Sequence, residues 1–170
     1  MTGGRHVILV GMMASGKSAV GPIVAERLGR PFVDSDDQVE ARTGRTVREI
    51  FESDGEAAYR VLEAEALREA VERAEPVVVA AAGGTVLDPG NRELMRSAGT
   101  VVWLYADPEV LAGRVSGGDH RPLLGDDPAA ALRRLHDERL PLYRDVADHV
   151  VDADDRSAED VAEQVLGLLA

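Results

Sequence analysis

Cysteine is absent from this chain of 170 residues. Its absence excludes disulfide bonds, thiolate zinc sites and a cysteine nucleophile. Aromatic residues make up only 4% of the sequence, so the hydrophobic core must be built from Ala, Val, Leu and Ile. No apolar run approaches the length of a membrane span, and the first residues lack the apolar segment of a signal peptide. We therefore expect a cytoplasmic protein.

Lysine is also scarce, with a single one in the chain, and the 31 Asp and Glu outnumber the 19 Lys and Arg, so the formal net charge is -12. A negative field repels polyanions, so we expect no binding to nucleic acid or to anionic membranes. The chain length suits one domain, which we place at residues 1–170.

Short apolar runs alternate with helical patterns along the chain. Strands are predicted at 6–10, 31–34, 77–81, 101–105 and 149–152, and helices at 17–28, 37–42, 47–52, 56–73, 91–97, 108–115, 129–140 and 158–168. This alternation predicts an α/β fold of three layers, with helices on both faces of a parallel sheet. Two segments, near 35–63 and 116–128, are predicted as flexible insertions.

The single lysine, Lys17, lies in the segment Gly11–Ser18, which reads GMMASGKS. This segment matches the phosphate-binding pattern G-x-x-x-x-G-K-[ST], and it stands between a predicted strand and a predicted helix, as that loop requires. In such a loop backbone amides surround the phosphates, the lysine reaches the β and γ phosphates, and the hydroxyl of Ser18 meets Mg²⁺. We expect a nucleoside triphosphate site here; the alternative is an ordinary glycine-rich turn.

Further blocks follow the glycine loop in a set order. They are Phe32–Asp36, Ile50–Phe51, Asp54–Glu56, Tyr59–Arg60, Gly83–Gly84, Asn91–Arg92, Arg121–Leu124 and Glu138–Tyr143. In this ordered set the chain resembles the shikimate kinases, which are similar in fold to nucleoside monophosphate kinases. The resemblance implies a five-stranded parallel sheet, a substrate-binding segment at about 35–63 and a lid at about 116–128.

The same resemblance implies an ATP- and Mg²⁺-dependent kinase that phosphorylates the 3-hydroxyl of shikimate, on the route to chorismate and the aromatic amino acids. The carboxylate of shikimate calls for forked guanidinium donors, and Arg60 and Arg139 match the two arginines of the family that bind it. Asp36 matches the acid that binds the ring hydroxyls and receives the proton of the attacking one. Gly83, beside Gly84, matches the substrate-binding glycine.

On the nucleotide side, Asp34 matches the acid near the metal, which acts through water. Arg121 matches the lid arginine that neutralises charge on the transferred phosphoryl group, and Arg114 and Arg156 resemble arginines near the adenine and phosphates. The resemblance also implies a monomer. The predicted sets are Lys17, Asp36 and Arg121 for catalysis; Ala14, Ser15, Gly16, Lys17, Ser18, Ala19, Arg114, Arg121 and Arg156 for the nucleotide; Asp36, Arg60, Gly83, Gly84 and Arg139 for the substrate; and Ser18 and Asp34 for the metal.

Each predicted site residue also has a purely structural alternative, which the sequence leaves open. The alternatives are a helix N-cap for Asp36, ion pairs with Glu56 or Glu63 for Arg60, a surface position for Arg139, loop polarity for Arg121, and core packing for Phe51 and Tyr59. The four histidines have no metal-ligand spacing, and Trp103 is expected in the core.

Two alanines stand where the family commonly has glycine, Ala14 in the phosphate loop and Ala82 before Gly83. If residue 82 takes a positive φ, alanine there costs energy; if φ is negative, the methyl group only narrows the space near the ring. The two alanines keep other functions open: a kinase for another small hydroxy acid or cyclitol such as gluconate, or a nucleotide-binding regulatory module without catalysis.

Overall fold

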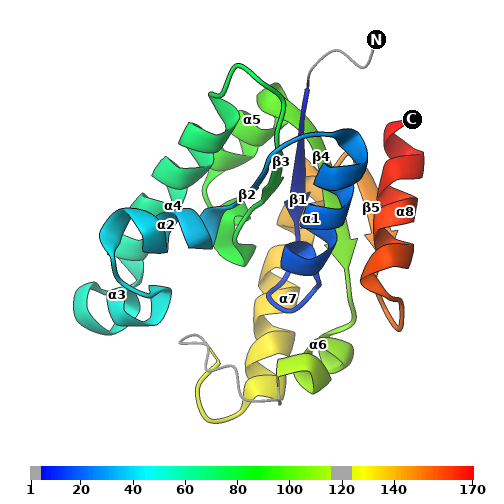
Figure 1. Ribbon diagram of the computed structural model, residues 1–170. Helices are drawn as coiled ribbons and strands as arrows, with labels where there is room; N and C mark the ends of the chain where they lie inside the picture. The colour runs from blue at the N-terminus through cyan, green and yellow to red at the C-terminus, as the bar shows by residue number, and fades with distance from the viewer. Residues whose placement is uncertain (1–4, 116–123) are drawn as a thin grey trace.

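The computed structural model describes residues 5–115 and 124–170, and within them five strands form one parallel sheet (Figure 1). The strands are β1 (His6–Val10), β2 (Phe32–Asp34), β3 (Val78–Ala80), β4 (Gly99–Tyr105) and β5 (His149–Asp152). Their order across the sheet is β2-β3-β1-β4-β5, and every neighbouring pair is parallel. The prediction of a parallel α/β sheet is confirmed.

The central strand β1 is apolar at every position except the first, and its place in the sheet explains this pattern. All five of its residues are buried, because the strand lies inside the sheet and is covered on both faces. Successive side chains point to opposite faces. Ile8 and Val10 accordingly join one hydrophobic cluster, and Val7 and Leu9 join another.

Helices supply the two outer layers. On one face, α1 (Lys17–Leu28) and α8 (Ala158–Leu169) pack through side chains such as Val24 and Val165. The other cluster contains residues of α4 (Glu56–Val71), α5 (Pro89–Ala98), α6 (Pro108–Val115) and α7 (Pro128–Val146), including Leu67 and Leu132. Figure 1 shows these two groups on opposite sides of the sheet, so the predicted three layers are present.

Two short helices, α2 (Ser35–Thr43) and α3 (Val47–Asp54), pack against α4 beyond the edge of the sheet (Figure 1). They share a small hydrophobic cluster, whose buried members are Val39, Ile50, Tyr59 and Ala66. The predicted insertion at 35–63 is therefore a helical unit with its own core, attached to the end of β2.

Several helix ends agree with their predicted signals. Helix α1 ends at Leu28 before Gly29, whose φ is 65°, and Thr46 and Glu49 form the predicted capping box at the start of α3. The N-cap interpretation of Asp36 is wrong. The side chain of Asp34 instead accepts hydrogen bonds from the amides of Asp36 and Asp37, and α2 begins at Ser35.

Two further elements differ from the prediction. Helix α7 continues through Pro141 to Val146 instead of ending at Leu140, since Tyr143 and Val146 are buried beyond the proline and their burial offsets its missing hydrogen bond. A 3-10 helix, η1 (Gly83–Leu87), was not predicted. In the described part of the chain, no helix has the length and apolarity that crossing a membrane requires.

Candidate active site

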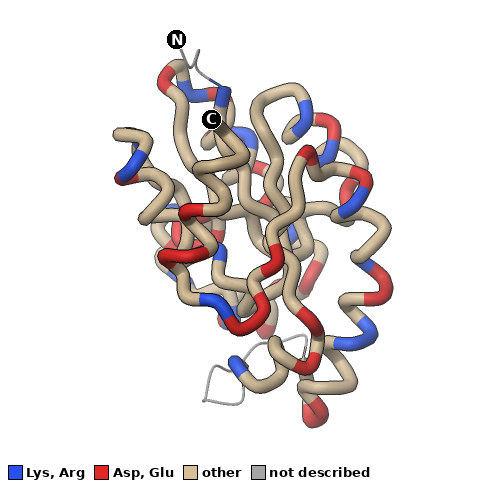
Figure 2. Tube along the Cα trace, turned by 90° about the vertical axis from the view of Figure 1, so that its right-hand side faces the viewer, with Lys and Arg blue, Asp and Glu red and all other residues tan. Residues whose placement is uncertain are grey.

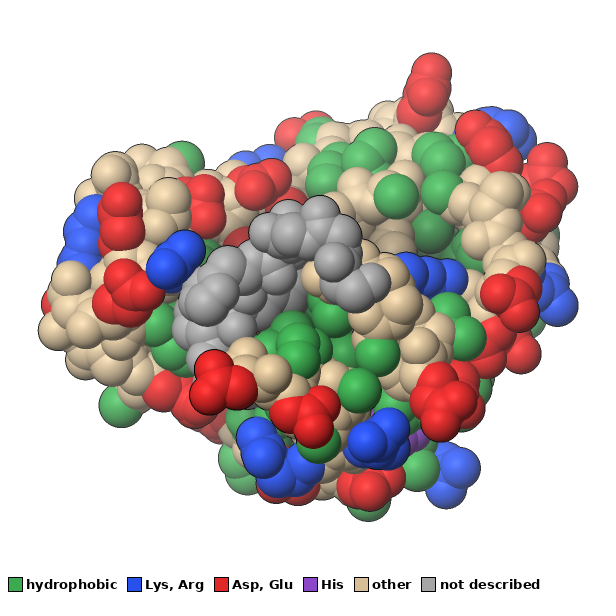
Figure 3. Space-filling view, turned by 90° about the horizontal axis from the view of Figure 1, so that it is seen from below, with side chains coloured by type: hydrophobic (Ala, Val, Ile, Leu, Met, Phe, Trp, Pro, Cys, Tyr) green, Lys and Arg blue, Asp and Glu red, His purple; other side chains and the backbone are tan. Residues whose placement is uncertain are grey.

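A cavity of about 370 Å³ opens at the edge of the sheet where the parallel strands end. Crevices outside the carboxyl ends of such strands are the usual ligand sites of α/β folds. It is lined by Met13, Ala14, Gly16, Lys17, Ser18, Ala19, Asp34, Asp36, Val47, Phe51, Tyr59, Arg60, Ala80, Ala81, Ala82, Gly83, Gly84, Arg114 and Arg139. Figure 3 looks onto the corresponding end of the molecule.

The glycine loop joins β1 to α1 at one side of this cavity, as predicted. A Cβ atom on Gly11 would lie 2.6 Å from the carbonyl oxygen of Leu104, so only glycine fits there. The ammonium of Lys17 donates hydrogen bonds to the carbonyl oxygens of Gly11, at 2.7 Å, and Met12, at 2.9 Å. It therefore lies over the loop, beside the positive N-terminal end of α1, in an arrangement suited to anions.

The two alanines differ in backbone conformation. Ala14 has a φ of 64°, in the left-handed region that favours glycine, whereas Ala82 has a φ of −57°. The guanidinium of Arg114 donates to the carbonyl oxygen of Ala14 at 2.9 Å and to that of Ala153 at 2.8 Å. Arg114 thereby links the glycine loop to the segment that follows β5.

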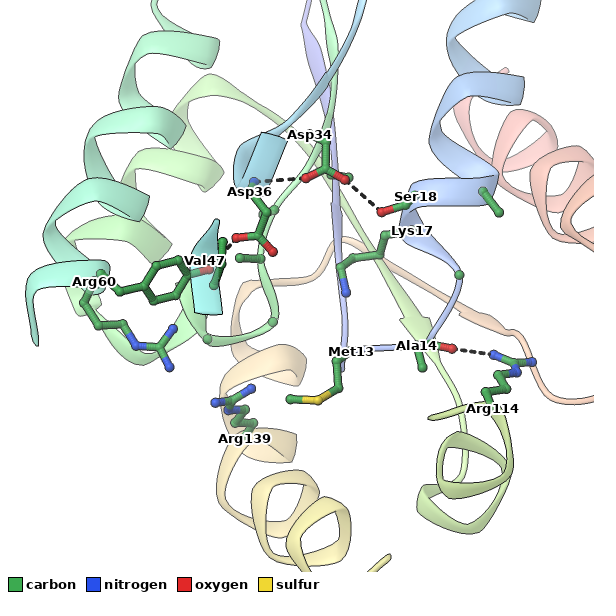
Figure 4. A pocket seen from close by; sticks show the side chains of 18 of the residues that line it. Met13, Ala14, Lys17, Ser18, Asp34, Asp36, Val47, Arg60, Arg114 and Arg139 are labelled. Atoms are coloured by element: carbon green, nitrogen blue, oxygen red, sulfur yellow. Dashed lines mark hydrogen bonds between the residues drawn. The ribbon is translucent and has the colours of Figure 1, made fainter. Parts of the chain in front are cut away.

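Two oxygen groups meet beside Lys17. The hydroxyl of Ser18 donates to Oδ2 of Asp34 at 2.8 Å, while Oδ1 of Asp34 accepts from the amide of Asp36 at 2.9 Å (Figure 4). Mg²⁺ prefers oxygen ligands and binds through one or two carboxylates together with phosphate and water. The pair fits that requirement, and in residues 5–115 and 124–170 no group of three or more His, Cys, Asp or Glu gathers to form an all-protein site.

Arg60 and Arg139 reach the cavity from different helices, α4 and α7, and Figure 4 shows both guanidinium groups extending toward the space below Asp36. Arg139 is only 2% exposed, so the surface interpretation of this residue is wrong. Its Nε is buried without a hydrogen-bond partner among the described residues. A buried donor in that state gains from an anionic acceptor in the cavity.

Arg60 combines its two sequence interpretations. Its Nη1 atom lies 2.9 Å from Oε2 of Glu63, the ion pair expected at three-residue spacing, while the same side chain lines the cavity. Glu63 is 1% exposed and also accepts a hydrogen bond from the hydroxyl of Thr85. Burial raises the pKa of Glu63, and the charge of Arg60 opposes that rise.

Glu63 was not among the predicted site residues, although a signal for it exists. It is four residues before the buried Leu67 and three before the buried Ala66, so it belongs to the apolar stripe of α4. A carboxylate in such a stripe requires a partner, because an unpaired buried charge is strongly unfavourable.

The adjacent glycines allow these arginines to approach the backbone. A Cβ atom on Gly84 would lie 2.0 Å from Nη1 of Arg60, and one on Gly83 would lie 3.3 Å from Nη1 of Arg139. The carbonyl oxygen of Gly83 accepts a hydrogen bond from the phenol of Tyr143 at 2.7 Å. Burial raises the pKa of Tyr143 to about 12, which keeps that phenol protonated and able to donate.

Asp36, Phe51 and Tyr59 close the cavity on the side of α2, α3 and α4, together with Val47, which was not predicted. Tyr59 is 4% exposed and its phenol donates a hydrogen bond to Oδ1 of Asp36. Tyr59 is thus both a core residue and part of the cavity wall, and Trp103 lies in the core as expected.

Two predicted nucleotide residues within the described part of the chain, Ser15 and Arg156, do not line this cavity. Ser15, a residue of the glycine loop, is buried. Arg156 lines a second depression with Asp160, Glu163 and Gln164. Arg121 and most of the predicted lid lie outside the described residues, so their roles stay predictions.

Comparisons with known proteins agree with the family resemblance of the sequence. The family model "Shikimate kinase" matches residues 13–170. A shikimate kinase of Symbiobacterium thermophilum is 48% identical over 164 residues, covering 95% of this chain and 94% of that protein. One from Burkholderia pseudomallei is 45% identical over 162 residues, covering 95% of this chain and 88% of that protein.

Solved structures agree. Shikimate kinase from Acinetobacter baumannii, in complex with shikimate, superposes with a TM-score of 0.95 at 38% identity, covering 99% of this chain and 94% of that one. A gluconokinase from Sinorhizobium meliloti gives a TM-score of 0.64 at 23% identity, covering 97% and 91% of the two chains, and shares the fold alone. The family model and the shikimate kinase relatives, each of which matches over most of its length, place this chain in the shikimate kinase family.

Proposed function

We propose that this protein transfers the γ-phosphoryl group of ATP to the 3-hydroxyl of shikimate. The observation that carries the proposal is the meeting of Arg60 and Arg139 in one cavity with Lys17 and Asp36. Two guanidinium groups on one side suit a carboxylate, a lysine over a glycine loop suits phosphates, and an aspartate between them suits hydroxyls. Shikimate carries the carboxylate and the hydroxyls on one ring.

On the nucleotide side, the loop amides and Lys17 bind the phosphates, and Arg114 holds the loop through the carbonyl oxygen of Ala14. Ser18 and Asp34 are the residues that would hold Mg²⁺, whose chemistry is to neutralise charge on the phosphate oxygens. Lys17 adds a positive charge next to the same phosphates, without relying on a proton transfer.

On the acceptor side, Asp36 accepts a hydrogen bond from the attacking hydroxyl and receives its proton as the phosphoryl group is transferred. Phosphoryl transfer passes through a loose transition state, which needs little help from a strong base. The larger contribution of Asp36, Arg60 and Arg139 is therefore to hold the ring in line with the phosphate.

The test is a coupled assay of ADP release with Mg²⁺ and ATP over shikimate, quinate, gluconate and nucleoside monophosphates. We expect turnover with shikimate and far less with the others. Preference for gluconate or quinate would support the kinase of another hydroxy acid. If none of these acceptors gives ADP release while ATP binding is intact, the result would support the regulatory module.

Two variants locate the activity in the cavity. Arg60→Ala removes one charge-assisted fork and should raise KM for shikimate by about tenfold or more, while Lys17→Met should abolish turnover. Arg27→Ala, which removes an exposed arginine at the far end of α1, is the matched control and should leave both parameters unchanged. An unchanged KM in Arg60→Ala would remove that residue from the substrate site.

The proposal extends to four further points, of which all but the cytoplasmic location follow from the family resemblance. The segment at 35–63 binds the substrate, the segment at 116–128 closes over the nucleotide with Arg121, and the chain works as a monomer in the cytoplasm. Arg121→Ala should lower kcat more than it weakens the equilibrium binding of shikimate.

A further inference from the structure

The phenol of Tyr59 contacts the carboxylate that receives the proton in the proposed reaction. Tyr59 stands on the first turn of α4, and its hydroxyl donates a hydrogen bond to Oδ1 of Asp36 on the first turn of α2. Both residues line the same cavity. This contact links α4 to the start of α2, directly after the end of β2.

The phenol is held firmly in place. The rings of Phe51 and Tyr59 pack with centroids 4.7 Å apart, and the guanidinium carbon of Arg60 lies 5.5 Å from the centre of the Tyr59 ring. Tyr59 is 4% exposed and belongs to the cluster that joins α2, α3 and α4. Because its ring is buried and packs against Phe51 and Arg60, its hydroxyl is a donor in a set position.

Donation from Tyr59 to Asp36, and not the reverse, follows from the surroundings of the phenol. Burial, together with the negative charges of Glu63 and Asp36, raises the pKa of Tyr59 well above its usual range. The phenol therefore keeps its proton at neutral pH. An ionised carboxylate has no hydrogen to give and can only accept.

A carboxylate needs such a donor in order to present one orientation. The terminal torsion of an aspartate side chain has a broad distribution, so it is not set by rotamer preference alone. Figure 4 shows the Asp36 carboxylate pointing into the space that Lys17, Arg60 and Arg139 also face. A hydrogen bond to Oδ1 sets the plane of the carboxylate within that space.

We propose that Tyr59 is a positioning residue for the acceptor hydroxyls, acting by holding the carboxylate of Asp36 in the orientation that binds them. Its chain neighbour Arg60 faces the same cavity, so one turn of α4 sets both the contact for the ring hydroxyls and a contact for the ring carboxylate. The spacing of these two contacts then selects an acid whose hydroxyls stand across a ring from its carboxylate. The inference rests on the proposed function of Asp36 and Arg60.

The test uses Tyr59→Phe, which keeps the buried ring and removes only the hydroxyl. We expect kcat/KM for shikimate to fall about tenfold, the effect of losing one hydrogen bond to a charged group. KM for ATP should change by less than about twofold, since the variant leaves the glycine loop intact. Thermal unfolding of the variant shows whether it retains its fold.

Binding of two ligands separates positioning from packing. Shikimate carries the hydroxyls, whereas cyclohex-1-ene carboxylate keeps the carboxylate and lacks them. Tyr59→Phe should weaken equilibrium binding of shikimate about tenfold and leave binding of the analogue within about twofold. An equal loss for both ligands would mean that Tyr59 shapes the cavity or Arg60 in general, and would overturn the inference.

A double-mutant cycle with Asp36→Ala tests whether Tyr59 acts through Asp36. Once Asp36 is gone, Tyr59→Phe should weaken shikimate binding by no more than about twofold. Phe51→Leu, a change at a wall residue with no polar atom, is the comparison and should weaken binding similarly with or without Asp36. An undiminished effect of Tyr59→Phe in the Asp36→Ala background would show direct contact with the ligand and sink the proposal.

Failure of this inference is distinguishable from failure of the proposed function. If the wild-type protein releases no ADP with shikimate, the proposed function is wrong. If the wild type is active and Tyr59→Phe matches it in kcat/KM, only the role of Tyr59 is wrong.

Discussion

At the scale of single residues, one backbone angle separates two alanines that look alike in the sequence. Ala82 has a negative φ, where alanine is unstrained, so its methyl group only occupies space beside the cavity. Ala14 has a φ of 64°, where a side chain costs roughly 1–2 kcal/mol relative to the right-handed region. The phosphate loop of this chain is therefore strained at one position.

Replacing Ala14 by glycine should relieve that strain. Because glycine also gains entropy in the unfolded chain, we expect Ala14→Gly to raise the free energy of unfolding by no more than about 1 kcal/mol. Urea denaturation measures it as a higher midpoint with an unchanged slope. Ala57→Gly, at an exposed helical position on α4, is the control and should destabilise by up to about 1 kcal/mol. A loss of stability in both variants would show that residue 14 is unstrained.

At the scale of elements, the first two turns of α4 carry much of the candidate site. Tyr59 contacts Asp36, Arg60 faces the cavity, and Glu63 holds Arg60 from one turn further along. Glu63 also accepts from Thr85 on η1, so the helix and the loop after β3 are joined at the arginine. The orientation of Arg60 is thus a property of the helix and its neighbour together.

Glu63 should make the free energy of unfolding depend on pH. Burial raises the pKa of Glu63 above its unfolded value of 4.5, so the folded state holds more protons than the unfolded state just above that pH. Stability from this residue is complete below pH 4.5 and is lost as pH rises through the folded pKa. We therefore expect the free energy of unfolding of the wild type, relative to Glu63→Gln, to fall as pH rises.

Urea denaturation of both proteins between about pH 4.5 and 8 measures this difference. Thr85→Val, which removes the donor and leaves the carboxylate, is a companion variant and should retain a pH dependence from Glu63. If the free energy of unfolding of the wild type, relative to Glu63→Gln, instead grows with pH, the attraction of Arg60 outweighs burial and the pKa of Glu63 is lowered.

At the scale of the whole molecule, the net negative charge and the cations of the cavity have opposite effects on anionic ligands. The net charge is -12, and Figure 2 shows acidic residues along much of the chain, with basic residues interspersed. The cavity, in contrast, gathers Lys17, Arg60, Arg114 and Arg139. These cations give anionic ligands a local attraction within a molecule of net negative charge.

Self-repulsion of the acidic surface should be visible in the salt dependence of stability. Raising NaCl from about 0.02 M to about 0.5 M shortens the range of charge interactions from roughly 20 Å to a few ångströms, so we expect Tm to rise by a few degrees. Shikimate binding should weaken over the same range, because its proposed contacts with Arg60 and Arg139 are ionic. A falling Tm would indicate that surface ion pairs such as Arg45–Asp54 outweigh the net repulsion.

Local signals in the sequence were sufficient for the sheet and the glycine loop. The apolar run at 6–10, the motif ending in Lys17 and Ser18, and Gly29 at the end of α1 each act over a few residues, so their structures agree with prediction. Where packing between distant segments decides, prediction was weaker. The predicted helix ends at Leu140, yet α7 passes through Pro141 because buried residues follow.

The amino-acid sequence by itself determined the parallel α/β fold, the phosphate loop and the family, since strand pattern, glycine spacing and ordered motifs are properties of the chain. Only the tertiary structure decided that Asp34 and not Asp36 caps α2, that Arg139 is buried, and that Ala14 and not Ala82 carries the left-handed backbone. Only the fold brings Tyr59 to Asp36 and Glu63 to Thr85. The reason is physical: burial and hydrogen-bond partners depend on residues far away in the chain, and a local pattern does not specify them.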